Sequence, residues 1–313
     1  MTQISAAMVK ELRDKTGAGM MDCKQALIEN NGDMDAAVDW LRKKGLSKAA
    51  KKSGRVAAEG LIGVAVKDKV GTAVEVNSET DFVARNAQFQ EMVREITKLA
   101  LDAAGDLNRL LAMPFPGKSA TVEEHVKEMI ATIGENMTVR RTALLTASEN
   151  GVIVDYVHNR VADGLGKIGV IVALESTGDK AKLAEFGRQV AMHIAASSPL
   201  AVTVEDLDSA VIERERKIYE EQAAASGKPA DIVAKMAEGR LRKEFFQQVV
   251  LLQQTFVIDG KSTVEEAMKE AAKSVGGDIK ITGFVRYALG EGIEKKEEDF
   301  AAEVAAAGSC TPA

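Results

Sequence analysis

An internal duplication restricts the fold of this chain more than any other feature of its sequence. The tetrapeptide Thr-Val-Glu-Glu occurs at residues 121–124 and again at 263–266, and each copy can form a capping box that starts a helix. Before each tetrapeptide lies a stretch of alternating apolar and polar residues, at 61–76 and at 152–175, which is typical of a β-hairpin. Both copies indicate the order strand, strand, helix, helix, strand. We therefore expect an α+β protein with a duplicated core of small antiparallel three-stranded sheets with helices.

The two copies differ in length between their helices. Ala73 corresponds to Gly169, an offset of 96 residues. Thr121 corresponds to Thr263, an offset of 142, so the second copy carries 46 extra residues. These fall at about 200–250, where apolar residues recur at near-heptad spacing on both sides of a Gly-Lys-Pro turn. The pattern predicts an inserted antiparallel coiled-coil hairpin that stands largely in solvent and serves for contact rather than catalysis.

The first 55 residues predict a separate module of three short helices. Ser5 and Asp33 are suited to cap helices, whereas the glycine-rich residues 16–19 and Gly45 are suited to end them. Residues 43–55 carry six positive charges and no acid. We interpret this stretch as a solvated basic linker rather than a binding patch.

Composition excludes several classes of protein. The 313 residues are 46% hydrophobic, enough to bury a core, and the longest apolar stretch, 168–174, is far too short to span a bilayer. The amino terminus lacks a signal-peptide pattern, and Cys23 and Cys310 form no CxxC pair, so we expect a reduced, cytoplasmic protein. A net charge of −6 and 4% aromatic residues argue against direct nucleic-acid binding. A protein partner remains the default.

The sequence suggests no catalytic or metal site. His125, His158 and His193 have no metal-ligand spacing between them. A nucleophile with its base and orienting group cannot be assembled from the motifs present. We therefore expect no cofactor.

The glycine-rich segment 16–24 is a weak candidate for a phosphate-binding loop, because it lacks the P-loop pattern and no strand precedes it. Its residue types favour a helix break in which Met20 or Met21 packs inside. Adjacent methionines on a helix cannot both face the same way, so one of them is expected at the surface.

The segment 79–86 follows a predicted strand and precedes a predicted helix, a position where binding residues are often found. From residue type alone, Phe82 would be a core residue and Asp81 a turn or capping residue. No second carboxylate for acid-base chemistry can be identified beside Asp81.

Taken together, the segments 16–24 and 74–84 resemble the bacterial elongation factor Ts family, as do residues 290–295 and 299–304 near the C-terminus. The resemblance runs from about residue 4 to residue 306. It implies a guanine nucleotide exchange factor that binds elongation factor Tu, with GDP or free of nucleotide, and promotes GDP release. Such a factor acts by protein-protein binding and is not an enzyme.

The resemblance also implies how the chain is divided. A ubiquitin-associated-like (UBA-like) three-helix module with the basic linker occupies residues 1–55, and the first core copy occupies 56–150. The second core copy, with the coiled coil inserted, occupies 151–289. A C-terminal module, expected to be helical, occupies 290–313.

By the same resemblance, residues of the N-terminal module contact the GTPase domain of the partner. Asp81 and Phe82 press on that domain near its magnesium site and displace the ion, with Phe82 as the wedge. His158 faces another domain of the partner. The complete set of implied partner-binding residues is Leu12, Met20, Met21, Lys24, Thr80, Asp81, Phe82, Val83 and His158.

Two other functions stay open on the sequence alone. The chain could be a UBA-like adaptor or scaffold protein without exchange activity, whose coiled coil recruits other proteins. A nucleotide-binding enzyme at the Gly17 to Gly19 loop ranks below both.

Overall fold

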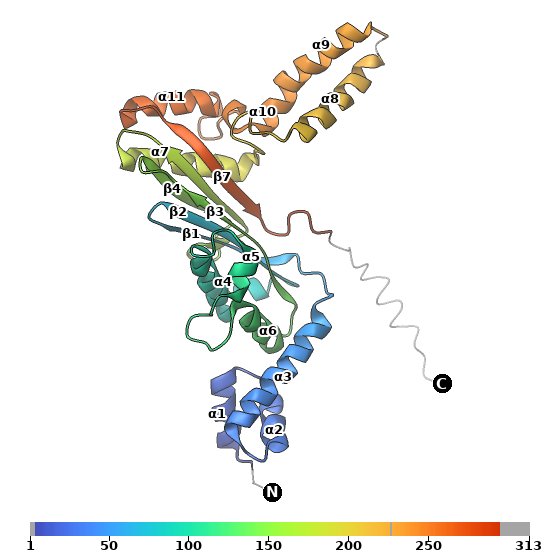
Figure 1. The fold of residues 1–313 in the computed structure, drawn as a ribbon, viewed down its shortest axis with the longest axis vertical. Helices are drawn as coiled ribbons and strands as arrows, with labels where there is room; N and C mark the ends of the chain where they lie inside the picture. Colours follow the sequence, from blue (N-terminus) through green and yellow to red (C-terminus); the bar gives the residue numbers. More distant parts are fainter. Residues whose placement is uncertain (1–3, 226, 295–313) are drawn as a thin grey trace.

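The computed structural model describes residues 4–225 and 227–294 (Figure 1). Three N-terminal helices lie at one end of an elongated molecule, two sheets with their helices form the middle, and a pair of helices projects from the other end (Figure 1). Most of the predicted C-terminal module, including residues 299–304 and Cys310, lies outside the described residues. None of the helices in the two described ranges combines the length and the apolarity that crossing a bilayer requires.

The first sheet is built around an antiparallel hairpin. Its strands, in order across the sheet, are β3 (Met137–Thr146), β2 (Val70–Ser78), β1 (Glu59–Lys67) and the short β5 (Leu165–Gly166). The helices associated with it are α4 (Ala87–Ala100), α5 (Leu107–Ala112) and α6 (Val122–Ile133). Apolar side chains spaced along α4, such as Phe89, Met92 and Ile96, are buried against Leu61 and Val74 of the sheet. This burial fixes α4 beside the hairpin.

The second sheet repeats this arrangement. Its strands, in order, are β4 (Gly151–His158), β6 (Ile168–Glu175) and β7 (Lys280–Ala288), all antiparallel. The helices packed on it are α7 (Lys180–Ser197) and α11 (Val264–Val275). In each copy the order along the main elements is strand, strand, helix, helix, strand, as the sequence predicts. The first sheet departs from the prediction by gaining a fourth strand, β5, from the loop between β4 and β6.

The two sheets pack against each other through the faces that their helices leave free. Ile62 and Ala73 of the first sheet share a buried cluster with Ile153 and Ile171 of the second. A Cβ atom at Gly169 would lie 2.6 Å from Cγ2 of Ile62, so the close approach of the sheets needs glycine there. The core is therefore layered as helices, sheet, sheet and helices (Figure 1).

The N-terminal helices are α1 (Ala6–Thr16), α2 (Met20–Glu29) and α3 (Met34–Lys52). The prediction that the third helix ends at Gly45 and leads into a solvated linker is wrong, because α3 continues to Lys52. Gly45 marks the crossing of α3 and α6, where an added Cβ would lie 3.1 Å from Cβ of Ala131. Ala49, one turn further on, is buried in the first core cluster. The basic stretch is thus a helix docked on the core.

The insertion between α7 and α11 contains two helices that pack along each other. These are α8 (Ser209–Ala224) and α9 (Ala230–Arg240), followed by the short segments η2 (Leu241–Phe245), α10 (Phe246–Val249) and η3 (Leu251–Gln253). Tyr219 of α8 and Ala237 of α9 are buried in the same apolar cluster. The pair projects away from the sheets (Figure 1).

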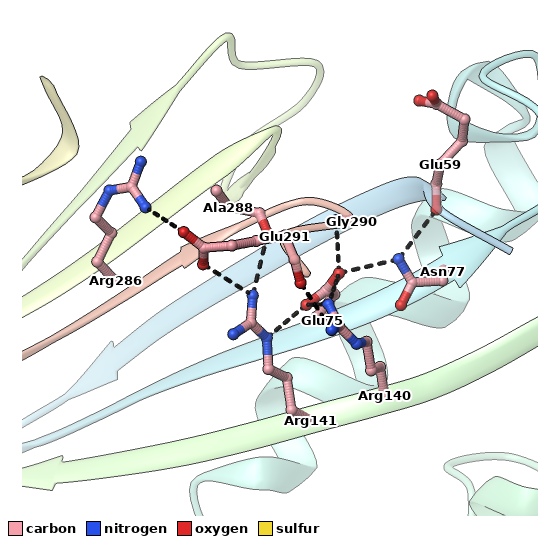
Figure 2. A network of polar contacts seen from close by, with 9 residues as sticks. All are labelled: Glu59, Glu75, Asn77, Arg140, Arg141, Arg286, Ala288, Gly290 and Glu291. Atoms are coloured by element: carbon pink, nitrogen blue, oxygen red, sulfur yellow. Dashed lines mark hydrogen bonds and ion pairs between the residues drawn. The ribbon is translucent and has the colours of Figure 1, made fainter. Parts of the chain in front are cut away.

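A buried polar network ties the chain beyond β7 to the first sheet (Figure 2). The carboxylate of Glu75 on β2 is fully buried. It accepts hydrogen bonds from Asn77 Nδ2 at 3.0 Å, from Gly290 N at 2.8 Å, from Arg140 Nη1 at 3.1 Å and from Arg141 Nε. Burial raises the pKa of Glu75, but the hydrogen bonds from Asn77, Gly290 and Arg141 lower it more, so the pKa lies below its ordinary value.

A β-bulge lets two consecutive arginines reach this one carboxylate. Arg141 lies opposite Glu75 and Val139 lies opposite Val76, so Arg140 is the extra residue on β3. The same arginines hold the far side of the network, because Arg140 Nη2 donates to the Glu291 carbonyl at 2.7 Å and Arg141 Nη2 donates to that of Ala288 at 3.1 Å (Figure 2).

Candidate functional site

The segment from Glu79 to Asn86, here called the Phe82 loop, connects β2 to α4 and presents an apolar side chain to solvent. Phe82 is 74% exposed, whereas the next two residues, Val83 and Ala84, are buried in the first core cluster. They begin the short helix η1 (Val83–Arg85). The expectation from residue type that Phe82 is a core residue is therefore wrong. The buried side chains of Val83 and Ala84 fix the backbone here, and the Phe82 ring is exposed to solvent.

The C-terminal side of the Phe82 loop is fixed by side-chain hydrogen bonds. Asn86 caps α4, because its Oδ1 accepts from the backbone N–H groups of Gln88 at 2.8 Å and Phe89 at 3.2 Å. Gln90 Nε2 donates to the carbonyl of Ala84 at 2.8 Å. The ring of Phe82 therefore extends from a constrained backbone.

The N-terminal side of the loop is held by a carboxylate from a distant part of the sequence. Thr80 donates its backbone N–H and its hydroxyl to the two carboxylate oxygens of Glu135, at 2.9 and 2.7 Å. Asp81, next to Phe82, forms a partly exposed ion pair with Arg85 at 3.6 Å. Asp81 lies in a turn, as its residue type predicts, and not at the N-cap of η1, which is Phe82. Its carboxylate remains within reach of a partner.

A second candidate surface lies on α2 and is called here the α2 face: Met20, Met21, Lys24 and Ile28. Met20 is 58% exposed and Met21 is 76% exposed, so neither packs inside, contrary to the expectation from residue type. Lys24 is exposed and Ile28 is half-exposed. Met20, Lys24 and Ile28 follow one another at intervals of four residues, which places them on one stripe of the helix.

Two predicted contact residues are buried. Leu12 is fully enclosed between the N-terminal helices, where it packs with Cys23 and Leu27. Val83 is buried in the first core. The prediction of direct partner contact needs correction for these two side chains, because apolar residues in the core support the exposed groups beside them rather than touch a partner.

His158 ends β4 and is exposed. Its Nδ1 lies 3.2 Å from the hydroxyl of Tyr156, and its backbone carbonyl accepts from Lys167 at 3.2 Å. These contacts are with its own sheet and neither the α2 face nor the Phe82 loop takes part in them. The structure thus places the predicted surface residues on three parts of the molecule.

A cavity of about 310 Å³ lies beside the crossing of α3 and α6, and the glycine-rich loop before α2 lines it. Asp22 in the first turn of α2 pairs with Lys44 at 3.1 Å and with Lys48 at 2.7 Å. The hydrogen bond from Lys48 is the main cause of the lowered pKa of Asp22. The Asp22 carboxylate lies at the N-terminal end of α2, and both lysines are already paired with it. The loop is therefore poorly suited to bind a phosphate.

The described part of the chain offers no cluster of three or more His, Cys, Asp or Glu side chains that could hold a metal ion. The buried His193 accepts a hydrogen bond at Nδ1 from the N–H of Val257 and lies 2.8 Å from Gln254 Oε1 through Nε2. Burial lowers its pKa, so it is a neutral structural residue.

Sequence reasoning missed Glu135. Its contact with Thr80 spans 55 positions, and no motif around residue 135 links it to the Phe82 loop. Only the fold reveals that this acid and the Phe82 loop meet.

Comparison with known proteins agrees with these features. The family model for elongation factor TS matches residues 79–291, more than half of the chain. Elongation factor Ts of Bartonella tribocorum is 61% identical over 304 residues, which cover 97% of this chain and 98% of that protein. The proteins of the same name from Parvibaculum lavamentivorans and Rhodospirillum centenum are 60% and 58% identical, each aligned over at least 97% of this chain. The chain belongs to the elongation factor Ts family, a family of translation elongation factors.

Proposed function

We propose that this chain is a guanine nucleotide exchange factor that binds elongation factor Tu, with GDP or free of nucleotide, and promotes GDP release. Membership of the elongation factor Ts family supports the proposal. The proposal includes no cofactor, no nucleic-acid contact and no covalent chemistry by this chain.

The observation that carries the proposal is the exposure of Phe82 on a loop whose neighbours are anchored. Burying a phenylalanine ring at an interface contributes about 1.5–3 kcal/mol, and a fixed backbone loses little further entropy on binding. A ring presented in this way can act as a wedge. Asp81 beside it carries a negative charge that would compete with phosphate for the magnesium ion of the partner.

Exchange then follows from differential binding. GDP is held in its site by phosphate contacts and a bridging magnesium ion, both strong in a dry pocket. A wedge that fits only when these contacts are lost favours the nucleotide-free partner. Linkage requires the effect to be reciprocal, so GDP must weaken binding of this chain by the same factor.

The proposal also assigns a role to each part of the chain. The three N-terminal helices serve as a UBA-like module whose α2 face, through Met20, Met21 and Lys24, docks on the GTPase domain. His158, in the second core copy, faces another domain of the partner. α8 and α9 form a coiled coil for contact, and the chain divides at residues 55, 150 and 289.

The test is release of a fluorescent GDP analogue from elongation factor Tu by Phe82→Ala. Since 1.4 kcal/mol corresponds to a factor of ten, the loss of ring burial should slow release about 10- to 100-fold. Thermal stability should stay close to that of the unchanged chain, because the ring is exposed. Ile258→Ala, which trims another exposed apolar side chain, is the control and should release GDP normally.

Normal release by Phe82→Ala would overturn the wedge. A collapse of thermal stability in this variant would instead mean that Phe82 supports the fold. If the unchanged protein bound elongation factor Tu without accelerating release, a UBA-like adaptor or scaffold would replace the exchange factor as the conclusion.

A further inference from the structure

The turn that follows α6, residues 134–136, contacts the Phe82 loop through several strong hydrogen bonds. Gly134 ends α6 in the left-handed conformation, with φ of 94°. This geometry turns the chain so that Glu135 and Asn136 face the beginning of the Phe82 loop. An L-residue adopts that conformation only with strain, so the turn depends on glycine.

The contacts between the two segments are reciprocal. Glu135 accepts two hydrogen bonds from Thr80, through Oε2 from the backbone N–H at 2.9 Å and through Oε1 from the hydroxyl at 2.7 Å. In return, the backbone N–H of Asn136 donates to Glu79 Oε1. Each segment thus binds the backbone of the other with a carboxylate, and hydrogen bonds to charged groups are stronger than neutral ones.

The same turn is connected to the N-terminal module. Lys52, the last residue of α3, donates to the carbonyl of Gly134. Asn136 Nδ2 donates to the carbonyl of Arg55 at 2.8 Å, and the Arg55 side chain lies 3.5 Å from Glu79. The turn therefore touches both the Phe82 loop and the end of the helix that supports the α2 face.

We propose that Glu135 is a positioning residue for nucleotide exchange: by binding Thr80 through both of its carboxylate oxygens, it fixes the Phe82 loop so that the ring meets the partner in one orientation. Glu135 acts through Phe82 and does not itself touch nucleotide or magnesium. This inference rests on the proposed function, because it gives Phe82 the role of the wedge.

The structure indicates that loss of this contact would loosen the loop without unfolding it. Beyond Phe82 the chain stays anchored by the buried Val83 and Ala84 and by the Asn86 cap. Before Phe82, Thr80 and Glu135 are only partly buried, so water can replace the lost hydrogen bonds. Glu79 would stay bound to Asn136, and the Thr80 carbonyl would stay bound to Ser78 Oγ, so the freedom gained is local to residues 80–82. These residues would then have to be ordered again each time the ring inserts.

The experiment compares Glu135→Ala and Glu135→Gln with the unchanged protein in GDP release from elongation factor Tu. The maximal release rate and the half-saturating concentration are measured separately. Glutamine keeps both contacts, since its oxygen can accept from the Thr80 N–H and its amide can donate to the hydroxyl. Glu123→Ala on α6, which breaks an exposed pair with Lys127, is the matched control.

We expect Glu135→Ala to lower the maximal rate roughly tenfold, because water replaces part of the two charge-assisted contacts that it removes, with little change in the half-saturating concentration. Glu123→Ala should stay near the unchanged rate, and Glu135→Gln, which keeps both contacts without the charge, should keep most of it. The decisive measurement is the double variant with Phe82→Ala, in which removal of Glu135 should have no further effect, because its role passes through the ring.

Two results would overturn the positioning role while leaving the wedge intact: an unchanged rate for Glu135→Ala, or an equal loss with and without Phe82. A normal rate for Phe82→Ala alone would instead overturn the wedge and, with it, the role of Glu135. If Glu135→Ala does not fold, Glu135→Asp replaces it. That variant keeps the charge but is one methylene too short to hold both Thr80 donors, and the same results decide.

Discussion

Replacing Glu75 by glutamine would remove the charge at the centre of the network that ties the end of β7 to the first sheet. Glutamine fits the same space, so the change tests charge rather than packing. Breaking a buried ion pair from one side costs about 3–5 kcal/mol. Here Arg140 and Arg141 are each 29% exposed and keep part of their hydration, and Arg141 retains Glu291 and the ring of Tyr287. We therefore expect a loss of about 2–3 kcal/mol.

Denaturant unfolding at neutral pH measures this loss, with Glu270→Gln as the control. Glu270 pairs with Lys273 in an ion pair in which both side chains are 73% exposed, and such pairs contribute at most about 1 kcal/mol. A loss below about 1 kcal/mol for Glu75→Gln would refute the reasoning, because it would mean that the arginines need no buried counter-charge.

The pH dependence gives a second readout for Glu75. Its folded pKa lies below its ordinary value of 4.5, so the unfolded chain binds the proton more readily than the folded one. The contribution of the charge is then fully present above that value and is lost as the pH falls below it. The stability difference between the unchanged chain and Glu75→Gln should shrink in acid, and a difference that grew there would contradict the assigned charge state.

Two further predictions follow, one from the α2 face and one from the helix crossings. Lys24→Ala should weaken binding to elongation factor Tu through a lost charge contact. The loss should nearly vanish at about 1 M salt, where the screening length is about 3 Å, and a loss of affinity that does not depend on salt would contradict a charge role. Lys10→Ala on α1 is the control. Gly239→Ala in α9 meets open space and should raise thermal stability by about 0.5–1 kcal/mol. Gly45→Ala should gain nothing, because its Cβ would crowd Ala131, and equal gains at both sites would contradict the tight crossing.

Local rules predicted the helix starts well. Thr121 with Glu124, and Thr263 with Glu266, form the two capping boxes because both partners lie within one turn of a helix. The antiparallel strand pairs were predictable for the same reason, since alternation is a property of neighbouring residues. A short turn joins only β1 and β2, whereas residues 159–167, with β5 among them, join β4 and β6. The duplication then extended these local predictions to the whole core.

Features that depend on distant contacts could not be predicted in this way. From the sequence, Gly45 resembles a residue that ends a helix. In the fold, α3 crosses α6 at this position, and the absence of a side chain at Gly45 allows the close approach. The pairing of Glu75 with Arg140 and Arg141 needs a bulge on a strand 65 residues further along the chain.

In the candidate site, too, the sequence alone could not predict the features that depend on tertiary packing. Residue type alone placed Phe82 in the core and either Met20 or Met21 inside, whereas Phe82 and both methionines are exposed. Family resemblance assigned partner contact to these exposed residues and also to Leu12 and Val83, which are buried. A sequence motif can identify a segment that binds a partner, but the packing of the fold determines which side chains of that segment are exposed.

The most direct test of the account is turnover by a substoichiometric amount of this protein. Elongation factor Tu is loaded with a fluorescent GDP analogue, mixed with excess unlabelled GDP, and followed with and without about one molecule of this chain per hundred. The account predicts that all of the labelled nucleotide leaves faster than it does spontaneously, because each molecule of this chain is released when GDP rebinds. Release that stops after one equivalent, or that proceeds at the spontaneous rate with folded protein, would contradict it.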